Sequence, residues 1–160
     1  MGLAKEKPLF AVQTDYEDDG YAWCYEQAEL LRQRRFSEVD LTNVVQELED
    51  MGSEKRFALR SSYRVLLHHL LKWEFQPERR SRSWLGTIVR ERINVMERLQ
   101  ESPSLKHRLE ELVEHAYRLA RREAVAETGL SPDTFPTSIP YTLAQLDDPD
   151  FLPGPEEPRP

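Results

Sequence analysis

Two adjacent histidines, His68 and His69, have the most direct capacity for chemistry in this sequence. Successive residues of a helix point about 100° apart, so the two rings face different surroundings. His69 falls on an apolar stripe that includes Leu66 and Trp73. A histidine there can bind a metal, act as a general base, or lie in the core with its ring nitrogens hydrogen-bonded. We interpret His69 as a structural residue and keep the base or ligand role as the alternative.

A second set, His107, Glu111 and His115, is spaced at intervals of four residues. On one helix these side chains share a face, as a metal site requires. That face lies about 100° from the apolar stripe through Leu105 and Leu109, so we expect it to be solvated. A di-iron bundle site needs Glu three residues before its histidine, and no histidine here has one. We therefore predict no metal and no cofactor, assign no catalytic residue, and favour a protein that is not an enzyme.

A third group is the polar corner that follows the histidines, over residues 72–84, with two tryptophans among its cations. Residues 75–101 carry six Arg against four Glu. Arginines ahead of a helix N-terminus can hold a phosphate or a carboxylate-rich partner, and tryptophans can stack on Arg or on a base. The alternative is that the arginines pair with acidic parts of the chain and the tryptophans are core. The candidate binding residues are His69, Lys72, Trp73, Gln76, Arg79, Arg80, Arg82, Ser83 and Trp84.

Helices must position all of these residues, because the chain has 21 Leu, 20 Glu and 17 Arg but only 3 Ile and 9 Val. The 3.6-residue periodicity predicts helices over about 15–35, 41–75, 83–101 and 103–128, with Pro77 pushing Gln76 out of the second helix. Asp40 is expected to cap the second helix and Gly129 to end the fourth. The stripe of the second helix stays in phase through Gly52, which favours one long helix over two. Ser131 and Thr142 each predict a short helix start.

These elements predict an all-α fold: an antiparallel four-helix bundle with one long central helix and a proline-rich C-terminal extension. We expect an N-terminal arm over 1–14, the bundle over 15–129, a segment packed on it over 130–153, and a disordered tail over 154–160. The second helix is longer than its neighbours. Part of it must therefore project or pair with another copy, which makes a homodimer one expectation.

Charge and composition exclude several classes of protein. The net charge of -7 disfavours a nucleic-acid binder. The sequence contains no run of about 20 apolar residues, so we predict no membrane helix. The first residues lack the apolar segment of a secretion signal, and a single cysteine fits a reducing compartment. We expect a cytoplasmic location, with Cys24 as a small buried residue.

Several segments resemble the bacterial Domain of Unknown Function 29 family. They are ELEDMG at 47–52, LLHHLLKW at 66–73 and QPERRSRSW at 76–84, together with YAW at 21–23, FP at 135–136, PYTLAQL at 140–146 and FLP at 151–153. The resemblance spans about residues 15–153 and implies a helical, bacterial, cytoplasmic protein. It implies no activity and no catalytic residue, and it leaves His107 and His115 outside the motifs.

The sequence therefore predicts a protein-interaction module that binds an unidentified protein partner through its Arg/Trp-rich corner. One alternative is a small-ligand-binding or enzymatic bundle, with a pocket formed around His69, Lys72 and Arg79 or Arg80. A second alternative is a nucleic-acid binder.

Overall fold

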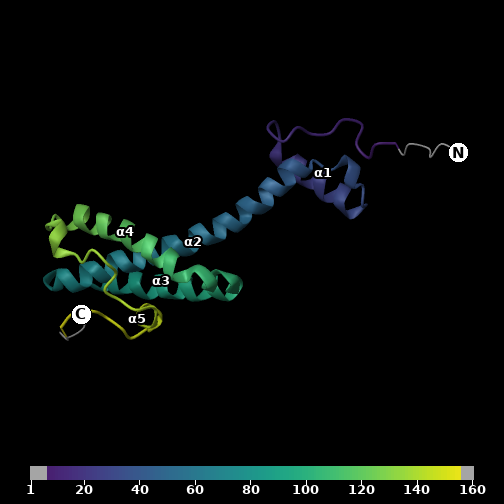
Figure 1. Cartoon of the computed structure of the whole chain (residues 1–160). Coiled ribbons are helices and arrows are strands. Elements are labelled where there is room, and N and C mark those ends of the chain that lie inside the picture. The colour runs from purple at the N-terminus through teal and green to yellow at the C-terminus, as the bar shows by residue number, and fades with distance from the viewer. Residues whose placement is uncertain (1–6, 156–160) are drawn as a thin grey trace. The chain divides into compact units, whose positions relative to one another are not determined.

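The computed structural model describes residues 7–155, and within that range it is helical with no strand. Its α-helices are α1 Gly20–Arg32, α2 Leu41–Phe75, α3 Arg82–Glu101, α4 Leu109–Thr128 and α5 Leu143–Asp147 (Figure 1). Short 3-10 turns are η1 Phe36–Glu38, η2 Pro77–Arg79, η3 Pro103–Arg108 and η4 Pro132–Thr134. The all-α class is confirmed. The predicted arm over 1–14 and tail over 154–160 lie partly outside the described residues.

Side-chain caps set most of the helix starts. Asp19 accepts a hydrogen bond from the Ala22 N–H at 3.0 Å, so α1 begins at Gly20 and not at residue 15. Asp40 accepts from the Asn43 N–H at 3.3 Å and caps α2 as predicted. Thr142 and Gln145 form a capping box at the start of α5.

The longest helix, α2, runs without a break through Gly52, which confirms the preferred interpretation of its stripe. A methyl group added at Gly52 would meet nothing within 4 Å, so neither packing nor backbone strain requires glycine there. Gly129 differs, because its φ of 70° is left-handed and ends α4. Only glycine adopts this conformation without a steric penalty.

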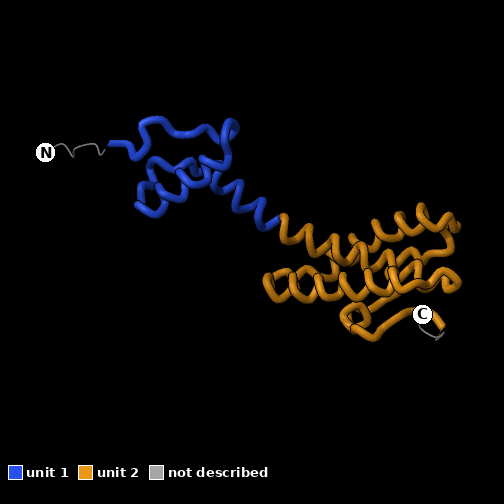
Figure 2. Tube along the Cα trace, turned by 180° about the vertical axis from the view of Figure 1, so that it is seen from behind, with its two compact units in different colours: residues 1–53 blue, residues 54–160 orange. Residues whose placement is uncertain are grey.

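The chain forms two compact units, residues 1–53 and 54–160 (Figure 2). In unit 1, the interior face of α1 carries Trp23, Gln27 and Leu30, all buried. The indole of Trp23 donates to Asp40, and Gln27 accepts the Asp40 N–H at 2.8 Å. These contacts tie α1 to the start of α2. Cys24 is exposed, so the prediction of a buried cysteine was wrong: the buried face passes through its neighbour Trp23.

Unit 2 contains the second part of α2, together with α3, α4 and α5 (Figures 1 and 2). Lys55 pairs with Glu101 at 3.8 Å, whereas Lys72 lies 4.4 Å from the Trp84 ring centroid. Residue numbers that rise along α2 therefore meet falling numbers along α3, so these two helices are antiparallel.

The residues of the main apolar core lie between Leu59 and Leu146 in the sequence. Their buried side chains come from α2, α3, α4 and the C-terminal segment. The expected antiparallel bundle of four helices over 15–129 is not confirmed. No helix in the described part is long and apolar enough to cross a bilayer.

Arginines hold the C-terminal segment of unit 2 by its backbone. Arg92, buried on α3, donates to four carbonyl oxygens: those of Leu146 at 3.0 Å, Phe151 at 2.7 Å, Pro149 at 3.3 Å and Gln145 at 3.4 Å. Arg121 on α4 donates in the same way to the carbonyls of Phe135 and Pro132. The buried side chains of Phe135, Tyr141 and Leu146 add apolar contacts with the core.

Candidate functional site

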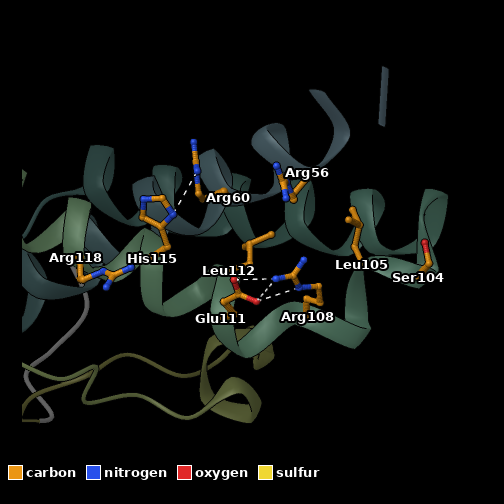
Figure 3. Close-up of a pocket in the computed structure, with 9 residues that line it drawn as sticks. All are labelled: Arg56, Arg60, Ser104, Leu105, Arg108, Glu111, Leu112, His115 and Arg118. Carbon is orange, nitrogen blue, oxygen red and sulfur yellow. Dashed lines mark hydrogen bonds and ion pairs between the residues drawn. The ribbon is translucent and has the colours of Figure 1, made fainter. Parts of the chain in front are cut away.

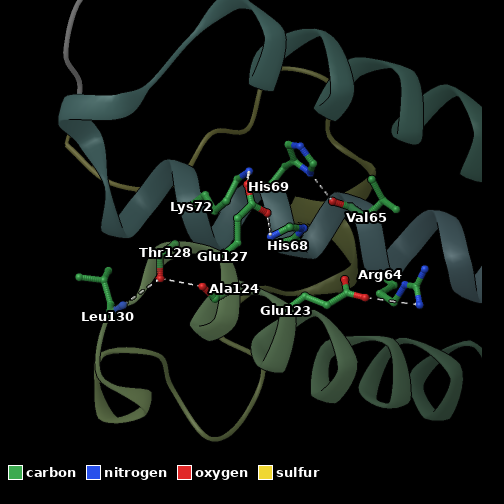
Figure 4. Close-up of polar contacts among 10 residues, drawn as sticks. All are labelled: Arg64, Val65, His68, His69, Lys72, Glu123, Ala124, Glu127, Thr128 and Leu130. Atoms are coloured by element: carbon green, nitrogen blue, oxygen red, sulfur yellow. Dashed lines mark hydrogen bonds and ion pairs between the residues drawn. The ribbon is translucent and has the colours of Figure 1, made fainter.

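The histidine and lysine of the 66–73 motif meet one carboxylate of α4 (Figure 4). Lys72 donates from Nζ to Glu127 Oε1 at 2.6 Å, and His68 Nε2 lies 2.8 Å from Glu127 Oε2. The His68 contact suits an ion pair by distance but does not have the angle of a hydrogen bond. Lys72 is only 3% exposed and also packs on the Trp84 ring. The lysine is therefore engaged inside the protein.

Burial controls the protonation of both histidines. It lowers the pKa of His68 to about 4, against a smaller opposing effect of Glu127. Burial also lowers the pKa of His69. His69 Nδ1 donates to the Val65 carbonyl at 2.9 Å, one turn earlier on α2. This contact favours a structural role for His69 over a base or ligand role.

Arg80 contacts both Trp73 and the backbone of residues 153–155. The Arg80 guanidinium lies over the Trp73 ring, 5.1 Å from its centroid, and Nε donates to the Trp73 carbonyl at 2.9 Å. Its other nitrogens donate to the carbonyls of Pro153 and Pro155. Gly154 lies so close that an added Cβ would be 2.7 Å from Arg80 Nη2. Within residues 7–155, Arg80 thus binds backbone carbonyls and no acidic side chain.

The nine residues predicted as a binding corner divide into two groups. His69, Lys72, Trp73, Gln76, Arg80 and Trp84 are buried or half-buried, whereas Arg79, Arg82 and Ser83 are exposed. Ser81, not Ser83, caps α3 by accepting from the Trp84 N–H. The structure therefore brings the corner together, and the side chains of His69, Lys72 and Arg80 make hydrogen bonds within the chain.

The three residues considered for a metal on the fourth helix do not share one helix. His107 lies in η3, and the α-helix begins only at Leu109. The three side chains are therefore not spaced along one face of an α-helix. Within residues 7–155, no three His, Cys, Asp or Glu side chains gather closely enough to hold a metal ion.

Glu111 and His115 instead line a pocket of about 360 Å³ in unit 2 (Figure 3). Its other polar lining residues are Arg56, Arg60, Ser104, Arg108 and Arg118. Sequence reasoning missed this pocket because its arginines come from helices about 50 residues apart. The only sequence signal is that Arg56 and Arg60 are four residues apart, which puts them on one helix face.

Unit 1 exposes apolar side chains on both of its helices. On α1, Tyr21 and Tyr25 are 76% and 65% exposed, and on α2, Leu41 and Leu48 are 66% and 63% exposed. Residues 1–53 also carry 12 acidic and 5 basic residues, a net charge of -7, whereas residues 54–160 carry 17 of each. The whole net charge of the protein thus resides in unit 1.

These observations define an all-α protein in which His68, Lys72 and Arg80 of the sequence motifs contact other parts of the same chain. The chain belongs to the family described as "Domain of unknown function DUF29", whose model matches residues 16–152. This match confirms the resemblance noted in the sequence. No curated protein and no solved structure matches the chain.

Proposed function

We propose that this protein is a protein-interaction module in which unit 1 binds a basic, amphipathic helix of a partner protein. The observation that carries the proposal is the apolar stripe on the exposed face of α2, formed by Leu41, Val45 and Leu48. Their spacing of four and three residues is that of a helix contact surface. Exposed apolar surface of this kind is typical of interaction sites.

A second helix presents similar chemistry. The rings of Tyr21 and Tyr25 on α1 contact each other at a tilt of 58°, with centroids 5.0 Å apart, and both side chains are exposed. Tyrosine is enriched at protein interfaces because its ring buries apolar area while its hydroxyl keeps a polar partner. The buried side chains of α1 lie on its other face, so the tyrosines contribute nothing to the interior of unit 1.

Charge selects the partner. A net charge of -7 on residues 1–53 attracts a basic surface and repels another copy of the same unit. An amphipathic partner helix fits these features, because its apolar face can cover the exposed stripe while its basic face meets the acidic charge. Arg79, Arg82 and Ser83 of the predicted Arg/Trp corner are also exposed, but they lie in unit 2 and are not part of this surface.

The test places a photo-crosslinking amino acid at Leu48 of the full chain in its native host. Met96, which lies on α3 and is 52% exposed, is the matched control position. We expect a protein that crosslinks at Leu48 and not at Met96. With that protein purified, Leu48→Asp should weaken binding about tenfold or more, and Met96→Asp should leave it unchanged.

Three outcomes would contradict the proposal. One is the same crosslinks at both positions. Another is a purified partner whose affinity does not change with Leu48→Asp or with salt, because acidic and basic surfaces must lose attraction as salt rises. The third is a crosslink at Leu48 to a second copy only, with a mass that depends on concentration, which would show a homodimer.

A further inference from the structure

The pocket between α2 and the η3–α4 region gathers four arginines against one carboxylate. Arg56 and Arg60 line one side, and Arg108, His115 and Arg118 line the other (Figure 3). Among the described residues, Glu111 is the only acidic one in the lining, so four arginines and one carboxylate leave an excess of three positive charges.

The carboxylate of Glu111 is already occupied. Arg108 donates to both of its oxygens, at 2.7 Å and 3.0 Å, in a bidentate pair. Within residues 7–155, neither Arg56, Arg60 nor Arg118 has an ion-pair partner, whereas most other arginines of unit 2 bind a carboxylate or a carbonyl. Three arginines without an ion-pair partner among these residues thus line one pocket.

Two of these arginines are held in place by packing. The guanidinium groups of Arg56 and Arg60 lie 5.3 Å and 4.9 Å from the centroid of the Phe57 ring. Arg60 Nη1 also lies 3.4 Å from His115 Nδ1, which accepts a hydrogen bond from it when that ring nitrogen carries no proton. Such cation–π contacts leave the N–H edge of a guanidinium free for an anion.

Apolar side chains complete the pocket. Leu105 and Leu112 line it beside the arginines, and Leu112 is buried. A volume of about 360 Å³ lies within the range of small-molecule sites. The lining therefore suits a ligand with an anionic group and a small apolar part.

We propose that this pocket binds a small organic phosphomonoester, with its phosphate between Arg60, Arg56 and Arg118 and its apolar part against Leu105 and Leu112. A phosphomonoester carries nearly two negative charges and three acceptor oxygens at pH 7, so it can engage several arginines at once. One carboxylate saturates with one guanidinium, as Glu111 does with Arg108. This site lies in unit 2 and does not depend on the interaction proposed for unit 1.

The experiment titrates the full chain with phenyl phosphate, which has a phosphate and an apolar ring, and measures binding by calorimetry. Inorganic phosphate and benzoate are the comparison probes. We expect one saturable site that binds phenyl phosphate more tightly than either comparison probe. Arg118→Met should lower the affinity about tenfold, because a charged hydrogen bond is lost.

Arg122→Met is the matched control, since Arg122 is also exposed on α4 but does not line the pocket. It should leave the affinity unchanged. Arg60→Met provides a second variant, which should weaken binding by about the same factor as Arg118→Met. A thermal melt of each variant checks that it is folded.

Four results would overturn the proposal. The first is the absence of saturable binding up to about 10 mM phenyl phosphate. The second is an equal loss of phenyl phosphate affinity in Arg118→Met and Arg122→Met. The other two would indicate a different ligand. A DNA duplex that binds with a steep salt dependence and is lost with Arg60→Met would indicate a nucleic-acid surface. Vesicles with phosphatidic acid that bind when soluble phenyl phosphate does not would indicate a membrane surface.

Discussion

Replacing Arg92 by methionine tests whether one guanidinium holds the C-terminal segment in place. Methionine keeps most of the apolar stem, so the packing of α3 is little changed. It removes all four hydrogen bonds to the carbonyls of residues 145–151. The Leu146 carbonyl then loses its buried donor.

The expected loss of stability follows from the two short bonds, to Phe151 at 2.7 Å and Leu146 at 3.0 Å. Hydrogen bonds to charged groups contribute about 1.5–3 kcal/mol each, and the two longer bonds add less. Burial of the guanidinium opposes this gain: it lowers the pKa of Arg92, while Asp148, Asp147 and Asp150 raise it. We therefore expect a net loss of about 3 kcal/mol.

Urea unfolding and amide hydrogen exchange measure this loss. The free energy of unfolding should fall by about 3 kcal/mol, and exchange in residues 143–151 should become about 100-fold faster. Arg90→Met is the control, because Arg90 lies on the same helix, is exposed and pairs only with its neighbour Glu91. It should change stability by less than about 0.5 kcal/mol. If Arg92→Met and Arg90→Met have equal effects, the reasoning is refuted.

Two further predictions concern glycine positions and pH. Gly129→Ala should destabilise the protein by about 1 kcal/mol because of its left-handed φ, and Gly52→Ala should stabilise it by up to about 1 kcal/mol, both measured by urea unfolding. The lowered pKa of His68 means that the unfolded chain binds this proton more readily than the folded one. Stability should therefore fall as pH drops from about 6.5 to 4, by at most about 1.4 kcal/mol per pH unit for this group. His69 adds to the effect in the same direction, and the lowered pKa of Glu127 adds to it below about 4.5. His68→Gln should flatten this dependence in unfolding curves measured across the range, and an unchanged slope would contradict the assignment.

Local signals in the sequence were enough to place most of the helices. The phase of the stripe through Gly52 predicted a continuous α2, and Asp40, Thr142 and Gly129 predicted helix ends that the structure confirms. These features depend on residues within one or two turns of each other. Sequence periodicity reports such short-range relations directly.

Long-range relations could not be predicted in the same way. On α1, Trp23 is buried while Tyr21 and Tyr25 are exposed, and nothing local in the sequence distinguishes these two faces. Arg92 looked like any other helical arginine, because its acceptors are carbonyls more than 50 residues away. The arginine pocket was invisible for the same reason: Arg60 and His115 meet only when α2 packs on α4.

The way in which unit 2 holds its last segment has a consequence for how that segment can vary in sequence. Many of the acceptors of Arg80, Arg92, Arg121 and Tyr117 are proline carbonyls, namely those of Pro132, Pro136, Pro149, Pro153 and Pro155. Proline fixes the backbone and has no N–H donor, so its carbonyl is the only polar group it offers. Hydrogen bonds to backbone carbonyls do not depend on which side chains the segment carries. We therefore expect the sequence to vary at the solvent-facing positions of this segment among relatives. Substitution of the arginines, the prolines or Gly154 should instead lower the free energy of unfolding.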